Sequence, residues 1–383
     1  MDATAKKYFG LLLGAMTGDC LGLPFEMLSP AKKIKIYGPQ ISHKFLSIPF
    51  QGQFGLCSDD TEHAWLTALA LYNTKEAALQ NFGDELAANL KRWLFTFPIG
   101  IGRATLLSGL KLIIGKKYSQ SGIHSAGNGA AIRALVIGAF YADDLETMLE
   151  AIQPQPGQSV GNSPQLRRSN TPVGAMLEAV NASTMITHTD KKAYEGSAAI
   201  ALAAATAMKS DLAQPPTHLL FDTLLPLTTG QELKQYLSSA QSHLAAGSSL
   251  ADYLKSVSIP ASGVSGYINH TVPAVIYAWL RYYGDYRETI SQLISAGGDT
   301  DSTAALAGAL SGLTVGAEGI PEDWLNGACG WPLKINHFRE ISQALSTNGA
   351  EPRDVPSNFL FFIRNILSLP IFGFHILRRI LGV

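Results

Sequence analysis

The sequence predicts an all-helical fold, and the first indication is the spacing of its apolar residues. These residues recur at intervals of three and four in EHAWLTALALYN (62–73), GAAIRALVIGAFY (129–141) and GSAAIALAAATAM (196–208). Such spacing places apolar side chains on one face of a helix. Alternation with a period of two, which would indicate strands, is scarce. We therefore expect a chain built almost entirely from helices.

The glycines are a second indication, because they point to helices that pack very closely. Gly14, Gly18 and Gly22 are spaced four residues apart, as are Gly308 and Gly312. Residues at this spacing lie on one side of a helix, and without a Cβ they let a neighbouring backbone approach. We expect dense helix stacking at both segments.

The composition is a third indication, and it also limits the classes of partner. Apolar residues make up 46% and charged residues 15% of the 383 positions, against roughly 25% charged residues in a typical globular protein. The formal net charge is −1 and there is no long basic block. A nucleic acid partner is therefore not predicted, and neither is an anionic membrane surface.

Cysteine usage and the N-terminal segment predict a cytoplasmic protein. The three cysteines are too few and too scattered for a disulfide framework, and no C-x-x-C pair indicates structural zinc. MDATAKKYFGLLLGAMTGDCLG resembles a signal peptide, but Asp19 and the lack of a convincing cleavage site argue against export. No run of ~18 uninterrupted apolar residues predicts a transmembrane span.

Two segments stand outside the regular helical pattern. Residues 153–173 are rich in proline, glycine, serine and glutamine, so we expect a loop or insertion that does not separate two domains. Residues 351–383 form an apolar C-terminal extension, which Arg364 and Pro370 interrupt. We expect the extension to pack on the domain. The alternative is a weak peripheral contact with a membrane or a partner.

The first acidic motif, SDDTEHAW at 58–65, stands directly before an apolar helical run. Ser58 is suited to cap this helix. Asp59 and Asp60 would then lie in its first turn, where carboxylates are favourable beside exposed N–H groups. Helix capping explains this motif when it is taken alone.

The second acidic motif, GGDTDST at 297–303, has a similar composition at the start of another predicted helix. The glycines end the preceding segment, Asp299 is suited to cap the helix, and Asp301 and Ser302 follow in its first turn. Helix capping again explains the motif when it is taken alone.

Together, the two motifs predict a metal centre. Each gathers two carboxylates and a hydroxyl at a helix start, where the backbone bends and such neighbours can converge on an ion. Oxygen ligands of this kind favour Mg²⁺ or Mn²⁺, and the absence of a Cys and His cluster argues against zinc. Four carboxylates in one cleft would repel one another, and two divalent ions would neutralise that charge.

A prenyl diphosphate enzyme is the alternative metal-dependent class. The segment DDTEH at 59–63 is close to the aspartate-rich motif of terpene synthases, which are also helical. We find no matching partner motif of Asn, Ser and Glu, and DTDS at 299–302 fits that class poorly.

A glycine-containing segment is the first of several further candidate sites. Gly127, Asn128 and Gly129 precede a predicted helix, so their N–H groups can open toward an anion such as a phosphate, although an ordinary helix start explains them equally well. Arg133, one turn further on, is then expected to be a surface or ion-pair residue.

Four single residues are weaker candidates. His188 lies in a polar cluster that can bind ribose hydroxyls or cap a loop, and Glu26 follows a proline at the end of the first helical pattern. Tyr267 and His270 can present a flat face to a base, whereas aromatic residues at such positions usually belong to the core.

The same motifs occur in the same order in a known family. GLLLGAMTGDCLGLPFE, SDDT, SAGNGAAIR, THTD, GYINHT and AGGDTDSTAALAG, within roughly residues 8–316, resemble the ADP-ribosylglycohydrolases. This group includes the dinitrogenase reductase-activating glycohydrolase and the ADP-ribosylarginine and ADP-ribosylserine hydrolases. The resemblance implies one large orthogonal helical bundle over 1–350, with a binuclear magnesium or manganese centre in a cleft.

The resemblance also implies roles for individual residues. The positions that match the metal-binding clusters are Ser58, Asp59, Asp60, Asp299, Asp301 and Ser302. The implied catalytic positions are Glu26 and Asp60. The implied substrate-binding positions are Gly127, Asn128, Gly129, His188 and Tyr267. Most members have threonine where Ser58 and Ser302 stand, and serine keeps the hydroxyl oxygen.

The activity implied by the resemblance is hydrolysis of a glycosidic bond at the distal ribose C1 of an ADP-ribosylated substrate. The substrate would be an ADP-ribosylated protein side chain or a small ADP-ribose conjugate, and ADP-ribose would be released. The alternative from a different class is a module that binds ADP-ribose without cleaving it, and the intact acidic clusters argue against that alternative.

Overall fold

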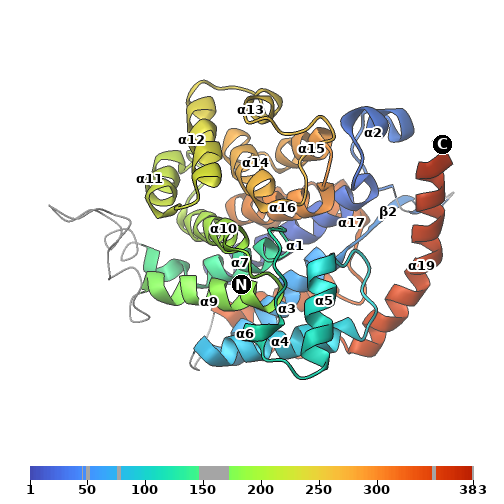
Figure 1. The fold of residues 1–383 in the computed structure, drawn as a ribbon. Coiled ribbons are helices and arrows are strands. Elements are labelled where there is room, and N and C mark those ends of the chain that lie inside the picture. The colour runs from blue at the N-terminus through green and yellow to red at the C-terminus, as the bar shows by residue number, and fades with distance from the viewer. Residues whose placement is uncertain (45, 49–51, 76–78, 146–171, 347–350, 382–383) are drawn as a thin grey trace.

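Helices dominate the fold, as the sequence predicts. The computed structural model describes residues 1–44, 46–48, 52–75, 79–145, 172–346 and 351–381 (Figure 1). The elements before residue 146 are α1 (Ala3–Gly22), η1 (Leu23–Phe25), α2 (Pro30–Tyr37), β1 (Leu46–Ile48), β2 (Gly52–Leu56), α3 (Asp59–Thr74), α4 (Leu79–Leu94), α5 (Arg103–Ile113), α6 (Tyr118–Ser121), α7 (Ala131–Phe140) and η2 (Ala142–Asp144).

The second part of the chain is also helical. Its elements are α9 (Pro172–Thr187), α10 (Lys191–Lys209), α11 (Thr217–Leu227), α12 (Gln231–Ala245), α13 (Leu250–Ser256), α14 (Ile268–Arg281), α15 (Tyr286–Ala296), α16 (Thr300–Val315), η5 (Ala317–Gly319), α17 (Glu322–Gly327), β3 (Ala328–Cys329), α18 (Ile335–Ser346) and α19 (Asn358–Leu381). Most of the predicted loop at 153–173 lies outside the described residues, and α9 begins at Pro172.

The glycine stripes bring α1 and α16 into backbone contact, which agrees with the predicted dense helix stacking; that the two segments stack on each other was not predicted. A Cβ added to Gly14 would lie 2.1 Å from the carbonyl oxygen of Gly308, and one added to Gly22 would lie 2.2 Å from that of Thr300. The contacts pair the end of α1 with the start of α16, so the two helices are antiparallel. This pairing places the segment after α1 beside the first turn of α16.

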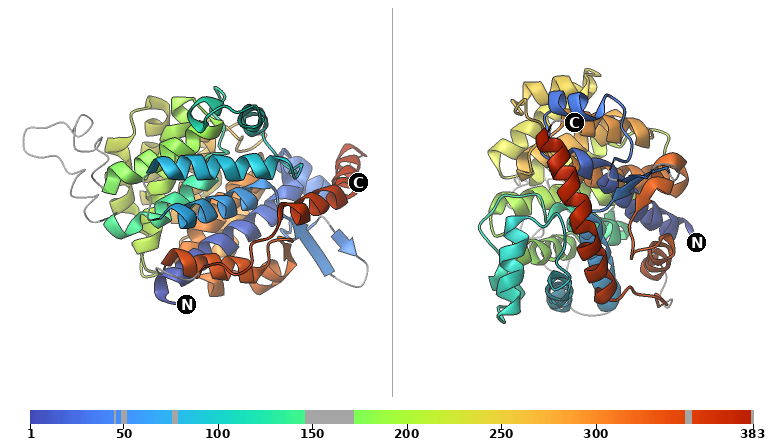
Figure 2. Two further views of the ribbon diagram at one scale, coloured as in Figure 1. Left: turned by 90° about the horizontal axis from the view of Figure 1, so that it is seen from below. Right: turned by 90° about the vertical axis from the view of Figure 1, so that its right-hand side faces the viewer.

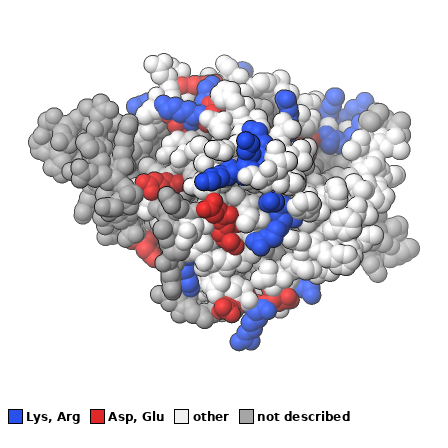
Figure 3. Space-filling model, turned by 60° about the horizontal axis from the view of Figure 1, so that its bottom comes forward, with Lys and Arg blue, Asp and Glu red and all other residues white. Residues whose placement is uncertain are grey.

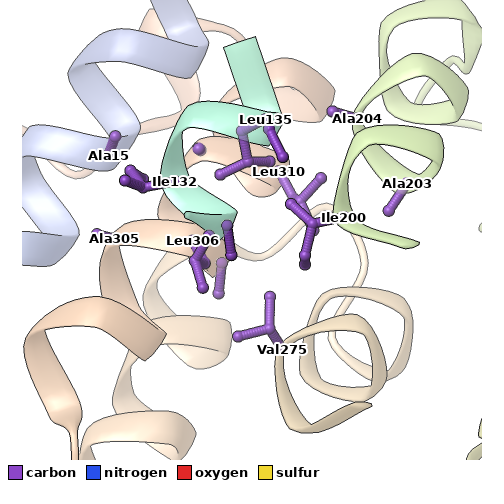
Figure 4. Packing of buried hydrophobic residues seen from close by; sticks show 14 of the residues in the cluster. Ala15, Ile132, Leu135, Ile200, Ala203, Ala204, Val275, Ala305, Leu306 and Leu310 are labelled. Carbon is purple, nitrogen blue, oxygen red and sulfur yellow. The ribbon is translucent and has the colours of Figure 1, made fainter. Parts of the chain in front are cut away.

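The core around this helix pair is made of small and medium-sized apolar side chains. Figure 4 shows side chains from several helices meeting in one cluster, among them Ala15, Ile132, Leu135, Ile200, Val275, Leu306 and Leu310. Each of these side chains is at most 2% exposed. The central helices therefore form a rigid support for the loops at their ends.

A small three-stranded sheet is the one departure from the all-helical expectation within the described residues. β2 pairs antiparallel with β1 and parallel with β3, where Leu56 is opposite Cys329. These strands have at most five residues, too few to produce a visible alternation in the sequence. The sheet matters for the site because β2 leads directly into Ser58.

The C-terminal extension forms α19, which crosses the outside of the molecule (Figure 2, right). Arg364 forms an ion pair with Glu62 of α3. Further along the helix, the Asn365 amide donates to the Thr96 carbonyl oxygen at 2.8 Å. The helix is therefore attached to the rest of the protein partly through polar side chains.

Two segments have the length and composition of a membrane span, on those criteria alone. The first, Ala3–Phe25, is 94% buried, so it is a core helix of this fold. The second, Asn358–Leu377, lies in α19 and is only 28% buried. Because core helices meet the same criteria, the predicted absence of a transmembrane span stays a prediction.

Candidate active site

The two acidic motifs lie against each other in the structure. The Ser302 hydroxyl, in the first turn of α16, donates a hydrogen bond to Oδ2 of Asp60 at 2.8 Å. On the other side of the cluster, the Asn128 amide donates to Oδ2 of Asp299 at 2.7 Å. One polar site therefore unites the starts of α3 and α16 with the loop before α7.

The first motif does cap its helix. Ser58 is the N-cap of α3, and its Oγ accepts the Asp60 N–H at 3.2 Å. The side chains of Ser58 and Asp60 are buried, so this helix start faces the interior of the protein. A hydroxyl used as a cap keeps a second lone pair for another ligand.

Asp19 is a site residue that sequence reasoning missed. Its carboxylate is fully buried and accepts the Ser58 N–H at 3.0 Å on each oxygen. It also accepts the N–H and the hydroxyl of Thr61, at 3.2 and 2.5 Å. Asp19 thereby fixes the start of α3 onto α1. The available signal was an aspartate within the otherwise apolar segment GAMTGDCLG.

The second motif is not an ordinary helix cap, which corrects the capping interpretation. Asp299 occupies the N-cap position of α16, but its side chain makes no capping hydrogen bond. Its carboxylate instead accepts from Asn128, 171 positions earlier. Asp301 is buried, and its Oδ1 has no hydrogen-bond partner among the described residues. Both carboxylates are therefore directed into the shared site.

The glycines of the second motif allow the chain to pass between two neighbouring segments. Gly297 and Gly298 have φ values of +74° and +90°, which favour glycine. A Cβ on Gly298 would lie 2.1 Å from the Val264 carbonyl oxygen. The N–H of Asp299 donates to that same oxygen at 2.7 Å. The approach to Asp299 is therefore fixed by backbone contacts.

Glu26 lies beside the second motif because its own loop pairs with Gly298. The Met27 N–H donates to the Gly298 carbonyl oxygen at 2.6 Å. Met27 has a φ of +61°, a strained conformation of the kind that clusters at functional sites. Burial raises the pKa of Glu26 to about 7, and the charge of Asp299 acts in the same direction.

The buried carboxylates raise one another's pKa values. Burial raises the pKa of Asp59 to about 7, with a further contribution from the charge of Asp19. Burial also holds the pKa of Asp60 and of Asp301 well above their ordinary values, and Asp59 and Glu26 respectively add to this effect. Such a cluster is unfavourable as a set of free anions.

The residues present fit a hard divalent cation by their chemistry. They offer carboxylate and hydroxyl oxygens, which Mg²⁺ and Mn²⁺ prefer, and Oδ1 of Asp301 lacks a protein partner in the described part of the chain. No three His, Cys, Asp or Glu side chains of the described residues are close enough to form a complete metal site. Two carboxylate oxygens, on Asp60 and Asp299, instead accept hydrogen bonds from Ser302 and Asn128.

The glycine segment before α7 only partly matches the predicted anion site. The Asn128 N–H donates to the Gly266 carbonyl oxygen at 2.9 Å, and the Gly127 N–H donates to the Ser125 hydroxyl at 3.2 Å. Two of the three N–H groups are thus already used. What the segment contributes is the Asn128 side chain, which contacts Asp299.

His188 lies against this segment, and Arg133 contacts Thr187, the residue next to His188. A Cβ on Gly127 would lie 3.1 Å from Nε2 of His188. Nδ1 of His188 and the Arg133 guanidinium both contact the Thr187 hydroxyl, at 2.8 and 2.6 Å. Burial lowers the pKa of His188 to about 3, helped by the charge of Arg133. His188 is therefore neutral.

Arg133 was expected to be a surface or ion-pair residue; it is fully buried, so the surface alternative was wrong. Besides Thr187, its guanidinium donates to the carbonyl oxygens of Gly129 and Ser183, at 2.9 and 3.0 Å. Burial lowers the pKa of Arg133 to about 10, and the charges of Asp59 and Asp60 act in the opposite direction. Arg133 therefore provides a positive charge close to the acidic site.

Tyr267 lies next to the glycine segment at the start of α14. Its backbone forms a bridge with Gly127. Its hydroxyl donates to Glu232, and it accepts from Lys192 at 2.6 Å. The ring packs edge-on against His270, with ring centres 5.0 Å apart. Tyr267 is thus held at the rim of the site by a polar network.

The fold and the site define a helical protein with an acidic centre assembled from two distant helix starts. The sequence pattern of the family described as ADP-ribosylglycohydrolase matches residues 1–349. The chain belongs to this family.

Individual relatives have low sequence identity to this chain, but they match it over most of its length. An uncharacterized protein of Archaeoglobus fulgidus is 26% identical over 337 residues, which cover 88% of this chain and 94% of that protein. ADP-ribosylhydrolase ARH3 of Xenopus tropicalis is 24% identical, with 86% and 93% covered. A solved structure titled ADP-ribosylglycohydrolase-related protein complex shares the fold, with a TM-score of 0.62 and 20% identity over 90% of this chain and 98% of that chain.

Proposed function

We propose that the protein is a metal-dependent hydrolase that releases ADP-ribose from an ADP-ribosylated substrate. The bond cleaved is the glycosidic bond at the distal ribose C1, and the substrate is a modified protein side chain or a small ADP-ribose conjugate. The observation that carries this proposal is the contact between the two acidic motifs, through Ser302 and Asp60. Family membership and the names of the relatives support it.

Six residues would hold two Mg²⁺ or Mn²⁺ ions: Ser58, Asp59, Asp60, Asp299, Asp301 and Ser302. These are the side chains that supply hard oxygen atoms to the shared site. When bound, such ions lower the pKa of water so that hydroxide is available near neutral pH. They would also relieve the repulsion among buried carboxylates that raises the pKa of Asp60.

Glu26 and Asp60 are the proposed catalytic residues. Glu26 lies beside Asp299, with a pKa near 7, so it can give or accept a proton at the reaction centre. Cleavage at C1 develops positive charge on the ribose ring. Carboxylates fixed beforehand around that carbon stabilise the developing charge.

Gly127, Asn128, Gly129, His188 and Tyr267 would bind the rest of the substrate. They lie next to one another, because Tyr267 pairs with Gly127 and His188 lies against it. A neutral imidazole is suited to hydroxyl groups because it can donate and accept one hydrogen bond. The ring of Tyr267 would then contact the adenine end.

The test is a substrate panel with the purified chain. ADP-ribosylated arginine peptide, ADP-ribosylated serine peptide and O-acetyl-ADP-ribose are incubated with Mg²⁺ or Mn²⁺, and free ADP-ribose is measured by mass spectrometry. We expect release from at least one substrate, and no release in EDTA. Tight ADP-ribose binding without release from any substrate would support the non-catalytic module instead.

A further inference from the structure

The outer face of α19 has the opposite polarity to that of an ordinary surface helix. The side chains that face the protein are of both kinds: Phe361, Ile371 and Phe372 pack on buried apolar residues, and the polar Arg364, Asn365, Ser368 and His375 are each at most 6% exposed. The side chains that face outward are apolar, and the most exposed are Phe359, Leu367, Leu369, Phe374, Ile376 and Leu377, at 51–70%. A helix normally buries its apolar stripe. Here an apolar stripe also points to the outside.

The inward polar residues are bonded to the protein, so α19 cannot simply rotate to bury its apolar stripe. Arg364 pairs with Glu62 and also donates to the Cys57 carbonyl oxygen at 3.1 Å. At the other end, Nε2 of His375 lies 2.9 Å from the Pro24 carbonyl oxygen, and Arg379 donates to that of Glu26. The same contacts argue against a helix that leaves the fold to span a bilayer.

The apolar face extends onto a neighbouring loop. The Phe97 ring, 67% exposed, lies 6.0 Å from the ring of Phe362. On the right of Figure 3, where α19 lies, a broad area carries few charged residues, with basic residues above it. Contiguous exposed apolar surface of this kind marks an interaction site.

The exposed charges that border the C-terminal end of this face are basic. Residues 27–58 and 355–383 contain no Asp or Glu, and they carry four lysines and three arginines. The first segment includes α2, whose Tyr37 stacks on His375 of α19 with ring centres 5.8 Å apart. Lys32 and Lys35 of α2 are exposed. The C-terminal end of the apolar face is therefore bordered by cations.

We propose that the outer face of α19 binds the surface of an anionic lipid bilayer. An exposed apolar stripe with adjacent lysines is the pattern of a helix that lies in the membrane interface, and each cation adds attraction to anionic lipids. A second copy of the chain would present the same two segments, which have no carboxylate to pair with these lysines. A bilayer satisfies both the apolar and the charged part of the face.

The experiment is vesicle flotation with the full chain. One set of vesicles contains equal parts of phosphatidylcholine and phosphatidylglycerol, and the other contains phosphatidylcholine alone. We expect the protein to float with the anionic vesicles and to bind them at least about tenfold more tightly than the neutral ones, because interfacial binding combines both attractions.

Two variants make the test specific to α19. Leu367→Glu combined with Phe374→Glu changes two outward side chains that are 63% and 70% exposed, so folding should be unaffected. The matched control is Leu212→Glu, at a residue 56% exposed near the start of α11. The double variant should lose at least about tenfold in vesicle binding, and the control should bind like the wild type.

Three results would overturn the proposal. The first is a wild-type chain that stays with the unbound fraction for both vesicle types. The second is a double variant that floats as well as the control while its melting temperature is unchanged. The third is a wild-type dimer in light scattering that the double variant abolishes, which would assign the face to a second copy of the chain.

Discussion

The Ser302 hydroxyl donates a hydrogen bond to Oδ2 of Asp60, although 242 positions separate the two residues. The contact depends on the glycine stripes that hold α1 against α16, and on Asp19, which ties the start of α3 to α1. Three helices are thus fixed relative to one another by backbone contacts and one buried carboxylate. The acidic site forms where their ends meet.

Ser302 should tolerate threonine but not alanine. Threonine keeps the oxygen that bonds Asp60, as in most members of the family the sequence resembles, whereas alanine removes it. We expect Ser302→Ala to lower kcat/KM at least about tenfold, a typical loss when a residue supporting a metal site is removed. Ser302→Thr should retain most activity. Equal activity of both variants would contradict a role for the hydroxyl.

Asp301→Asn should abolish turnover without unfolding the protein. Asp301 is a proposed metal ligand and is buried, with an Oδ1 that has no hydrogen-bond partner among the described residues, so its loss should lower kcat/KM by more than about 100-fold. Removing one of several repelling carboxylates should leave the metal-free protein at least as stable. Asp285→Asn, which keeps the cap of α15, is the control. Normal turnover by Asp301→Asn would refute the metal assignment.

Divalent ions should raise the melting temperature of the wild type. A ligand that binds only the folded state stabilises it by about 2.7 kcal/mol at a concentration of 100 Kd. Mn²⁺ in a thermal shift assay should therefore raise the transition by several degrees, and EDTA should reverse the change. Asp301→Asn should show a much smaller shift. The same shift in both proteins would indicate binding elsewhere.

The helical class was predictable from the sequence because apolar spacing and glycine stripes are properties of single helices. The stripes at Gly14 and Gly308 indicated that each of the two helices packs closely against some other helix. They did not indicate that the two helices pack against each other. The proposed metal-binding role of the acidic motifs follows from taking the two motifs together and from the resemblance to a family, since each motif alone has the pattern of a helix cap. For Asp299 that pattern was misleading, because its carboxylate caps nothing.

Three features could not be predicted from the sequence. Two depend on contacts between distant segments, and the third is a strand that is too short to recognise. Asp19 and Arg133 are charged residues within helices, and only the packing shows that both are fully buried beside the site. The cations near α19 are scattered over two segments, so they do not form a basic block in the sequence. The short β2 strand shows too little alternation to be recognised.

Asp19→Asn should destabilise the start of α3. The carboxylate accepts from the Ser58 N–H and from the N–H and hydroxyl of Thr61. An amide of the same shape has one acceptor oxygen, and its NH₂ group would face a donor. We expect a loss of about 2–4 kcal/mol in the free energy of unfolding, measured by urea denaturation. A wild-type midpoint and wild-type activity would show that Asp19 has no such role.

Gly14→Ala should be among the most destabilising changes that add a single methyl group. In an exposed helix this substitution stabilises by up to about 1 kcal/mol, because alanine has the higher helix propensity. At Gly14 the new Cβ would lie 2.1 Å from the Gly308 carbonyl oxygen. α1 and α16 would have to separate, and we expect a net loss of more than about 3 kcal/mol.

The matched control for this change is Gly373→Ala in α19, where an added Cβ has nothing within 4 Å. Urea denaturation should show a lower midpoint for Gly14→Ala and an equal or higher midpoint for the control. Activity should fall with stability at Gly14, because α1 leads to Glu26 and α16 begins beside Asp299, so a wider helix pair moves these carboxylates apart. A wild-type midpoint for Gly14→Ala would contradict the close backbone contact between α1 and α16 on which the site depends.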